Sequence, residues 1–163
     1  MARPTHRLDL VLVPDDAPIG QGHALLQRLV DAGVVREGGV MGPAGPGWAG
    51  SPFSRVYVDE PTQPTLYANR LGGFRVSCSS CGANVVPAFS RAMGQWRAGG
   101  ERRLACPQCG VSTDLAELDF RPPAAFGAWA FVVADTEAAS LPTEAHRAVV
   151  DALGSVRAVL RRS

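Results

Sequence analysis

Four cysteines, arranged as two pairs of the form C-x2-C, are the residues of this sequence best suited to chemistry. The pairs are Cys78 with Cys81 and Cys106 with Cys109, and a glycine follows each pair. Two such turns can place four thiolates around one ion as a tetrahedron, with metal–sulfur distances of about 2.3 Å. The glycines suit tight turns whose N–H groups point at the sulfurs, because glycine accepts positive φ. No cysteine is left over, so the pattern predicts a closed, structural metal site.

The stretch 74–112 resembles the zinc-ribbon (rubredoxin-like) knuckle family in these two C-x-x-C-G units. The resemblance implies that Cys78, Cys81, Cys106 and Cys109 hold a structural Zn²⁺ at the tips of two β-hairpins. It covers no other part of the chain. It implies no single function, since such ribbons serve in nucleic-acid binding, in protein docking and in plain stabilisation.

Three other readings of the cysteines stay open at this point. Iron would use the same four ligands, although the aromatic residues that shield a rubredoxin iron are missing from the segment Ala83–Val86. Two disulfides would require an oxidising compartment. A thioredoxin-type redox pair would place one C-x-x-C at the start of a helix after a strand. Two matched pairs favour a metal over both thiol alternatives, and the missing aromatic residues favour zinc over iron.

The composition predicts an ordinary globular protein. The chain has 163 residues, of which 46% are hydrophobic and 19% charged, which fits one compact domain with a small metal module. No apolar run approaches the ~20 residues that span a bilayer, and the first apolar run is too short, and too broken by Asp9, for a signal peptide. We therefore expect a cytoplasmic protein with no membrane partner. All 16 basic residues are arginine, which is typical of a GC-rich bacterial genome and excludes the lysine of a P-loop.

Positive charge is concentrated around the cysteines. Residues 74–110 contain five arginines and only one acid, a net charge of +4, before four thiolates and a divalent ion add −2. The arginines are Arg75, Arg91, Arg97, Arg102 and Arg103. Together with Trp96 as a stacking surface, they are the candidate contacts for a nucleic acid.

Hydrophobic periodicity predicts strands that alternate with three helices. The expected strands cover 7–13, 54–59, 66–68, 74–76, 102–105 and 126–133. The last is either a central strand buried on both faces or a buried helical turn, since periodicity does not separate the two. The expected helices cover 20–32, 87–97 and 143–161, and a helical turn followed by a link is expected at 114–120. Gly33 is the expected stop of the first helix, and Arg157, Arg161 and Arg162 are expected to complement the dipole of the last.

These elements predict an α+β fold: a small, mostly antiparallel sheet with two main helices on one face. The chain is expected to be a single domain over residues 1–163, in which 74–112 forms an inserted zinc-ribbon module with a short helix between its cysteine pairs. The Gly- and Pro-rich stretch 38–51 is expected to be a surface loop. Its Trp48 either folds back onto the body of the protein or anchors a partner.

No set of catalytic residues is evident. His6, His23 and His146 lie in the tail or early in expected helices, and no hydrolase or metalloprotease motif is present. The fragment Gly20-Gln21-Gly22 lacks the third glycine of a dinucleotide-binding motif. We expect a non-enzymatic bacterial protein that binds another protein, as an inhibitor, immunity protein or adaptor. The alternative is a nucleic-acid-binding zinc ribbon that uses the basic patch of residues 75–103.

Overall fold

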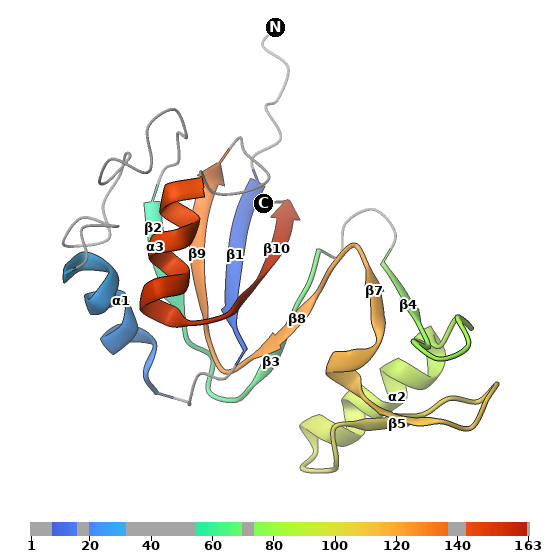
Figure 1. Cartoon of the computed structure of the whole chain (residues 1–163). Helices are drawn as coiled ribbons and strands as arrows, with labels where there is room; N and C mark the ends of the chain where they lie inside the picture. Colours follow the sequence, from blue (N-terminus) through green and yellow to red (C-terminus); the bar gives the residue numbers. More distant parts are fainter. Residues whose placement is uncertain (1–7, 16–19, 32–54, 70–73, 137–142, 163) are drawn as a thin grey trace, which may run out of the picture. The chain divides into compact units, whose positions relative to one another are not determined.

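The computed structural model describes residues 8–15, 20–31, 55–69, 74–136 and 143–162 (Figure 1). The chain forms two compact units. We call the first, which combines residues 1–71 and 124–163, the sheet unit, and the second, which spans Gly72–Pro123, the cysteine unit. The described residues form three α-helices and several small antiparallel sheets, which confirms the expected α+β class.

The sheet unit contains a four-stranded antiparallel sheet in the order β10-β1-β9-β2 (Figure 1). Its strands are β1 (Leu8–Pro14), β2 (Arg55–Asp59), β9 (Ala130–Thr136) and β10 (Val156–Arg162). The register aligns one residue of each strand across the sheet, in the row Leu160, Leu10, Val133 and Val56. The next row, Val159, Val11, Val132 and Tyr57, points to the opposite face, because side chains alternate along a strand.

Both helices of the sheet unit cover the same face of this sheet (Figure 1). Helix α1 (Gly22–Asp31) buries Leu29 there and helix α3 (Thr143–Leu153) buries Val149, against Leu10, Phe131 and Trp129. At the start of α1, the N–H of Gly22 donates to the Glu60 carboxylate over 3.2 Å. That bond satisfies one of the N–H groups that a helix leaves without an internal partner.

The opposite face is covered in part by a second, two-stranded sheet made of β3 (Thr65–Tyr67) and β8 (Ala125–Gly127). Tyr67 and Ala125 pack against Val11, Val132 and Val159 in a separate buried cluster. The expected strand over 126–133 is therefore wrong as one element. The chain bends after Gly127, whose missing side chain leaves room for Val13, and β8 and β9 join different sheets.

The expected last helix is also wrong in its second half. Helix α3 ends at Leu153, and Gly154 adopts a left-handed φ of 79° that stops it. The chain then returns as β10, which pairs with β1 over its whole length. Arg157 and Arg161 therefore lie on a strand and not at a helix terminus. Arg157 pairs with Asp15 over 3.1 Å and Arg161 pairs with Asp9 over 3.3 Å.

The cysteine unit contains one α-helix, a 3₁₀ turn and two antiparallel strand pairs. These are α2 (Val86–Arg97), η2 (Leu115–Glu117), the pair β4 (Arg75–Ser77) with β7 (Asp119–Arg121), and the pair β5 (Arg103–Ala105) with β6 (Ser112–Asp114). Its core includes the rings of Phe74, Phe89 and Phe120, whose centroids are 5.5 to 6.3 Å apart. The expected helix over 87–97 is confirmed, and Pro87 lies in its first turn, where it costs no hydrogen bond.

The segment 114–120 was expected to be a helical turn followed by a link. The turn is η2, which Asp114 caps by accepting a 2.8 Å hydrogen bond from the N–H of Ala116. The prediction of a link after this turn is wrong, because residues 119–121 form strand β7, which pairs with β4. Gly33 and the loop 38–51 lie outside the described residues.

Candidate metal centre

The two C-x-x-C-G loops of the cysteine unit fold into the same turn. In the first, the N–H of Cys78 donates to the carbonyl of Ala83 over 2.9 Å, and the N–H of Gly82 donates to the carbonyl of Cys78 over 2.8 Å. The second loop repeats both bonds at 2.9 and 2.8 Å, through Cys106, Val111 and Gly110. The first loop connects β4 to α2, and the second joins β5 to β6.

The glycine that closes each turn is required by its backbone conformation. Gly82 has φ of 73° and Gly110 has φ of 76°, in the left-handed region that residues with a Cβ rarely occupy. A Cβ on either residue would meet no atom within 4 Å. The requirement for glycine is therefore one of backbone strain and not of space.

The four sulfurs lie close together and form no disulfide. The Sγ atoms of Cys78 and Cys109 are 3.8 Å apart, those of Cys81 and Cys106 are 3.7 Å apart, and all four lie within 4.8 Å of one another. A tetrahedral ion with metal–sulfur bonds of about 2.3 Å has sulfur–sulfur edges of about 3.8 Å. The cluster could therefore hold one metal ion with little movement.

The backbone favours the thiolate form of the first cysteine in each loop. The N–H groups of Cys81 and Ser80 lower the pKa of the Cys78 thiol to about 6, because a hydrogen bond to the charged form stabilises it. The pKa of Cys106 is lowered in the same way, by the N–H groups of Cys109 and Gln108. Two of the four donors are thus prepared to bind a cation, since the thiolate is the form that ligates metals.

The second cysteines differ in their surroundings. Cys78 and Cys106 are 2% exposed, whereas Cys81 and Cys109 are exposed to solvent. The N–H of Ala83 lowers the pKa of Cys81, but burial of its sulfur and the three neighbouring sulfurs outweigh this and raise it to about 11. Within the described part of the chain, these cysteines are the one group of three or more metal-ligating side chains close enough to share an ion.

The candidate nucleic-acid contacts are not brought together. Arg102 binds the Asp114 carboxylate through two bonds of 3.0 and 3.2 Å, and Arg103 binds Ser112. Arg91 and Arg97 are exposed on α2, Arg75 is exposed on β4, and none of the three forms an ion pair with a described residue. Trp96 is half-buried and has an interaction partner. Trp48 lies outside the described residues.

One exposed arginine was missed by the sequence analysis. Arg121 lies on β7, directly opposite Arg75 on β4. The signal for it was the alternation of Asp119, Phe120 and Arg121, in which one aromatic residue stands between two charged ones. That pattern is typical of a half-buried strand.

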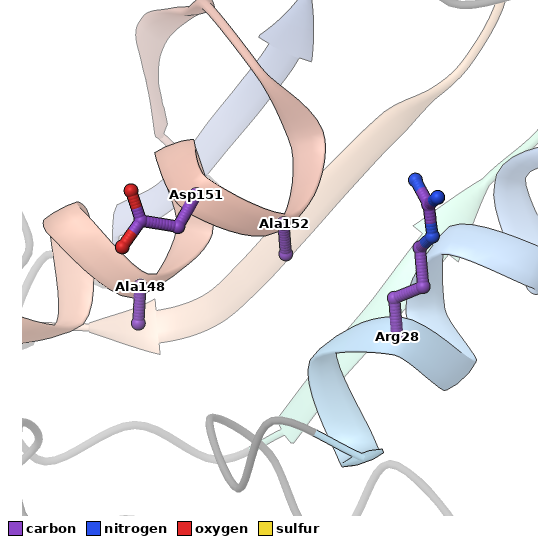
Figure 2. Close-up of a pocket in the computed structure, with 4 residues that line it drawn as sticks. All are labelled: Arg28, Ala148, Asp151 and Ala152. Atoms are coloured by element: carbon purple, nitrogen blue, oxygen red, sulfur yellow. The ribbon is translucent and has the colours of Figure 1, made fainter.

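A groove of about 530 Å³ lies between α1 and α3 in the sheet unit. It is lined by Arg28 from α1 and by Ala148, Asp151 and Ala152 from α3 (Figure 2). Figure 2 shows that the Asp151 carboxylate points away from Arg28. Among these four lining residues the only ionisable side chains are Arg28 and Asp151.

None of the described helices is long and apolar enough to cross a membrane. The chain was also compared with protein-family models, with curated proteins and with solved structures, and no match was found in any of the three comparisons.

Proposed function

We propose that this chain is a non-enzymatic, zinc-stabilised protein of the bacterial cytoplasm that acts by binding another protein. The observation that supports the zinc-stabilised, non-catalytic part of the proposal is the closed arrangement of four cysteine sulfurs at tetrahedral spacing. Four protein ligands leave no position for water or substrate, so the ion would hold the fold and not perform chemistry. When bound, Zn²⁺ supplies a cross-link between the two loops.

Zinc fits this donor set, and the aromatic residues that shield a rubredoxin iron are missing after the first cysteine pair. Four thiolates suit a borderline-soft ion with no preferred geometry of its own. Iron would take the same ligands, and absorption spectroscopy of the purified protein separates the two, because ferric thiolate is coloured and zinc thiolate is not. The four free thiols lie on two like turns, which supports a zinc ribbon.

The charged side chains of the sheet unit support a role without catalysis. Asp9 and Asp15 form ion pairs that connect β1, and the residue after it, to β10. His23 is exposed on α1, with its Nε2 3.5 Å from the Glu60 carboxylate that caps this helix. Each of these groups therefore has a structural partner, and none is placed beside a candidate nucleophile.

The nucleic-acid alternative receives less support. Of the five arginines proposed to contact phosphates, Arg102 and Arg103 are held by Asp114 and Ser112. Trp96, the proposed stacking surface, is half-buried. Polyanion binding depends on many cations that face the phosphates together, and here Arg75 and the pair on α2 lie on different elements.

Affinity purification tests the proposed function. The full chain is expressed with a tag in a bacterial host, and the lysate is divided and purified with and without nuclease. A protein that co-purifies in both samples at a fixed ratio supports the proposal. Material that is lost with nuclease supports the nucleic-acid alternative. A preparation that contains neither a co-purified protein nor a nucleic acid contradicts both candidate functions. Elemental analysis of the same preparation should give one zinc ion per chain.

A further inference from the structure

Strands β4 and β7 of the cysteine unit form a two-stranded ribbon (Figure 1). One face of this ribbon is buried and the other is exposed. Val76 on β4 lies opposite Phe120 on β7, and both are buried. The ring of Phe120 packs edge-on against Phe89 of α2, with centroids 5.5 Å apart. The ribbon therefore turns this face toward α2, and the residues that alternate with Val76 and Phe120 point away from the helix.

Two arginines lie opposite each other on the outward face. Arg75 is the register partner of Arg121, and both are exposed, with 79% of the Arg121 side chain accessible. Directly opposed residues of an antiparallel pair have Cα atoms about 5 Å apart, and like charges in such positions destabilise a sheet. The Asp119 carboxylate, 3.3 Å from Arg121, offsets this repulsion on one side only. A further anion that reaches Arg75 would offset the rest.

A carboxylate of the chain itself already binds one of these two arginines on the same face. The Asp119 carboxylate lies 3.3 Å from the Nε of Arg121, on the same strand. Arg75 has no ion-pair partner among the described residues, so its fork of N–H donors is available to an incoming group. Guanidinium groups bind carboxylates through two parallel hydrogen bonds. Because the Arg75 side chain is exposed, an acidic side chain of another protein can reach its guanidinium group.

We propose that Arg75 and Arg121 form a binding site for a carboxylate group of an acidic segment in the partner protein. This inference rests on the proposed function and names the surface and the chemistry of that partner. The four acids and six arginines between residues 74 and 123 give a net charge of +2, which four thiolates and a divalent ion reduce to zero. A neutral unit with one local pair of cations suits a short acidic peptide better than a phosphate chain, which requires a row of cations.

The matched control is a second pair of exposed arginines in the same unit, Arg91 and Arg97. Arg91 and Arg97 are exposed on the solvent side of α2, and Arg91→Gln/Arg97→Gln removes the same charge as Arg75→Gln/Arg121→Gln. The two double variants therefore differ in position and not in net charge. Zinc content and circular dichroism of each full-length variant should match the original chain, because all four side chains are exposed.

The probes are a fluorescein-labelled oligoglutamate peptide and a labelled oligothymidylate, each titrated by fluorescence anisotropy into the zinc-loaded chain. Arg75→Gln/Arg121→Gln should bind the acidic peptide about tenfold more weakly than the original chain, the effect expected for the loss of a charge-assisted pair. Arg91→Gln/Arg97→Gln should change the affinity by less than about twofold, since distant exposed charges are screened. Equal losses in both variants, or no peptide binding by the original chain, would overturn the site.

Tighter binding of oligothymidylate than of the peptide, lost in Arg75→Gln/Arg121→Gln, would overturn the proposal in favour of a nucleic acid. The affinity purification described above distinguishes failure of the Arg75–Arg121 site from failure of the proposed protein-binding function. If a protein still co-purifies with Arg75→Gln/Arg121→Gln, the site assignment fails and the proposed function stands. If no protein co-purifies with the original chain, the proposed function itself fails. The proposal is supported when the co-purified protein is lost from this variant and retained by Arg91→Gln/Arg97→Gln.

Discussion

The same substitution, glycine to alanine, should have opposite effects at two positions of the cysteine unit. Gly110 closes the second cysteine turn with φ of 76°, whereas Gly94 lies inside α2 with helical geometry and an exposed surface. A Cβ added at either position would meet nothing within 4 Å. Neither substitution therefore creates a collision, and the difference between them comes from the backbone alone.

The expected magnitudes follow from the two conformations. Alanine in the left-handed region costs about 1–2 kcal/mol, which is offset by about 0.4–1 kcal/mol because alanine restricts the unfolded chain more than glycine does. Gly110→Ala should thus cost about 1 kcal/mol. Gly94→Ala should stabilise the unit by about 1 kcal/mol, the difference in helix propensity between the two residues.

Zinc affinity is the measurement that reports both changes. The cysteine unit has fewer than the ~60 residues that give a domain a sufficient core, so folding and metal binding should occur together. Because about 1 kcal/mol is about a fivefold change in an equilibrium constant, Gly110→Ala should weaken zinc binding about fivefold and Gly94→Ala should strengthen it by a similar factor. Competition with a chromophoric chelator gives both values.

Two results would refute this reasoning. An unchanged zinc affinity in Gly110→Ala would mean that the turn does not require a left-handed residue or that the metal does not depend on it. Weaker binding in Gly94→Ala would mean that residue 94 is not in an exposed helix. Thiol titration of the metal-free variants should detect four reactive cysteines in each, which shows that the ligands themselves are intact.

The remaining predictions concern the metal ligands and the closure of the sheet. Cys106→Ser should lose its zinc and the secondary structure of the cysteine unit, measured by elemental analysis and circular dichroism, and full metal content in this variant would exclude the site. The pKa of Cys78 is lowered to about 6, so its thiolate is present above that pH and is lost as the pH falls through it. Zinc affinity, measured by chelator competition across pH, should therefore decrease toward acid and most steeply below about pH 6, and a flat profile would contradict thiolate ligation. Asp9→Asn should lower the stability of the sheet unit by about 1–3 kcal/mol in urea unfolding, because Arg161 loses the buried carboxylate that it pairs with and keeps its hydrogen bond to the Tyr57 hydroxyl. An unchanged midpoint would show that the ion pair contributes nothing.

The parts that could be predicted from the sequence are those whose signals are local. Each cysteine turn is specified by five consecutive residues that end in a glycine of positive φ, at Gly82 and Gly110. Helix α2 follows from the spacing of Phe89, Ala92 and Met93, all three of which are buried. Neither feature depends on a segment that is distant in sequence, so the local sequence was sufficient to predict both the cysteine turns and helix α2.

The errors arose where the partner strand is distant in sequence. Val156 and Leu160 are four residues apart, which fits a helix, but four is also a multiple of the strand period of two. The segment forms a strand because it pairs with the edge of β1, where every residue from Val156 to Arg162 has a register partner. Gly154 was the local signal that the helix ends, and its left-handed φ confirms that role. Strand β7 was missed for the same reason, since its partner β4 precedes the whole metal site.

The chain connections predict that the sheet unit stays folded when the proposed metal is removed from the cysteine unit. The strands that flank the cysteine unit, β3 and β8, pair with each other, so that Tyr67 lies opposite Ala125. The insertion therefore leaves and re-enters the sheet unit at neighbouring backbone positions. The first and last strands, β1 and β10, also pair with each other and are joined by the Asp9–Arg161 ion pair. Every strand pair of the sheet unit is thus made within that unit, and loss of the metal would remove none of its hydrogen bonds. A chelator should consequently unfold the cysteine unit in a separate transition, at lower denaturant than the sheet unit.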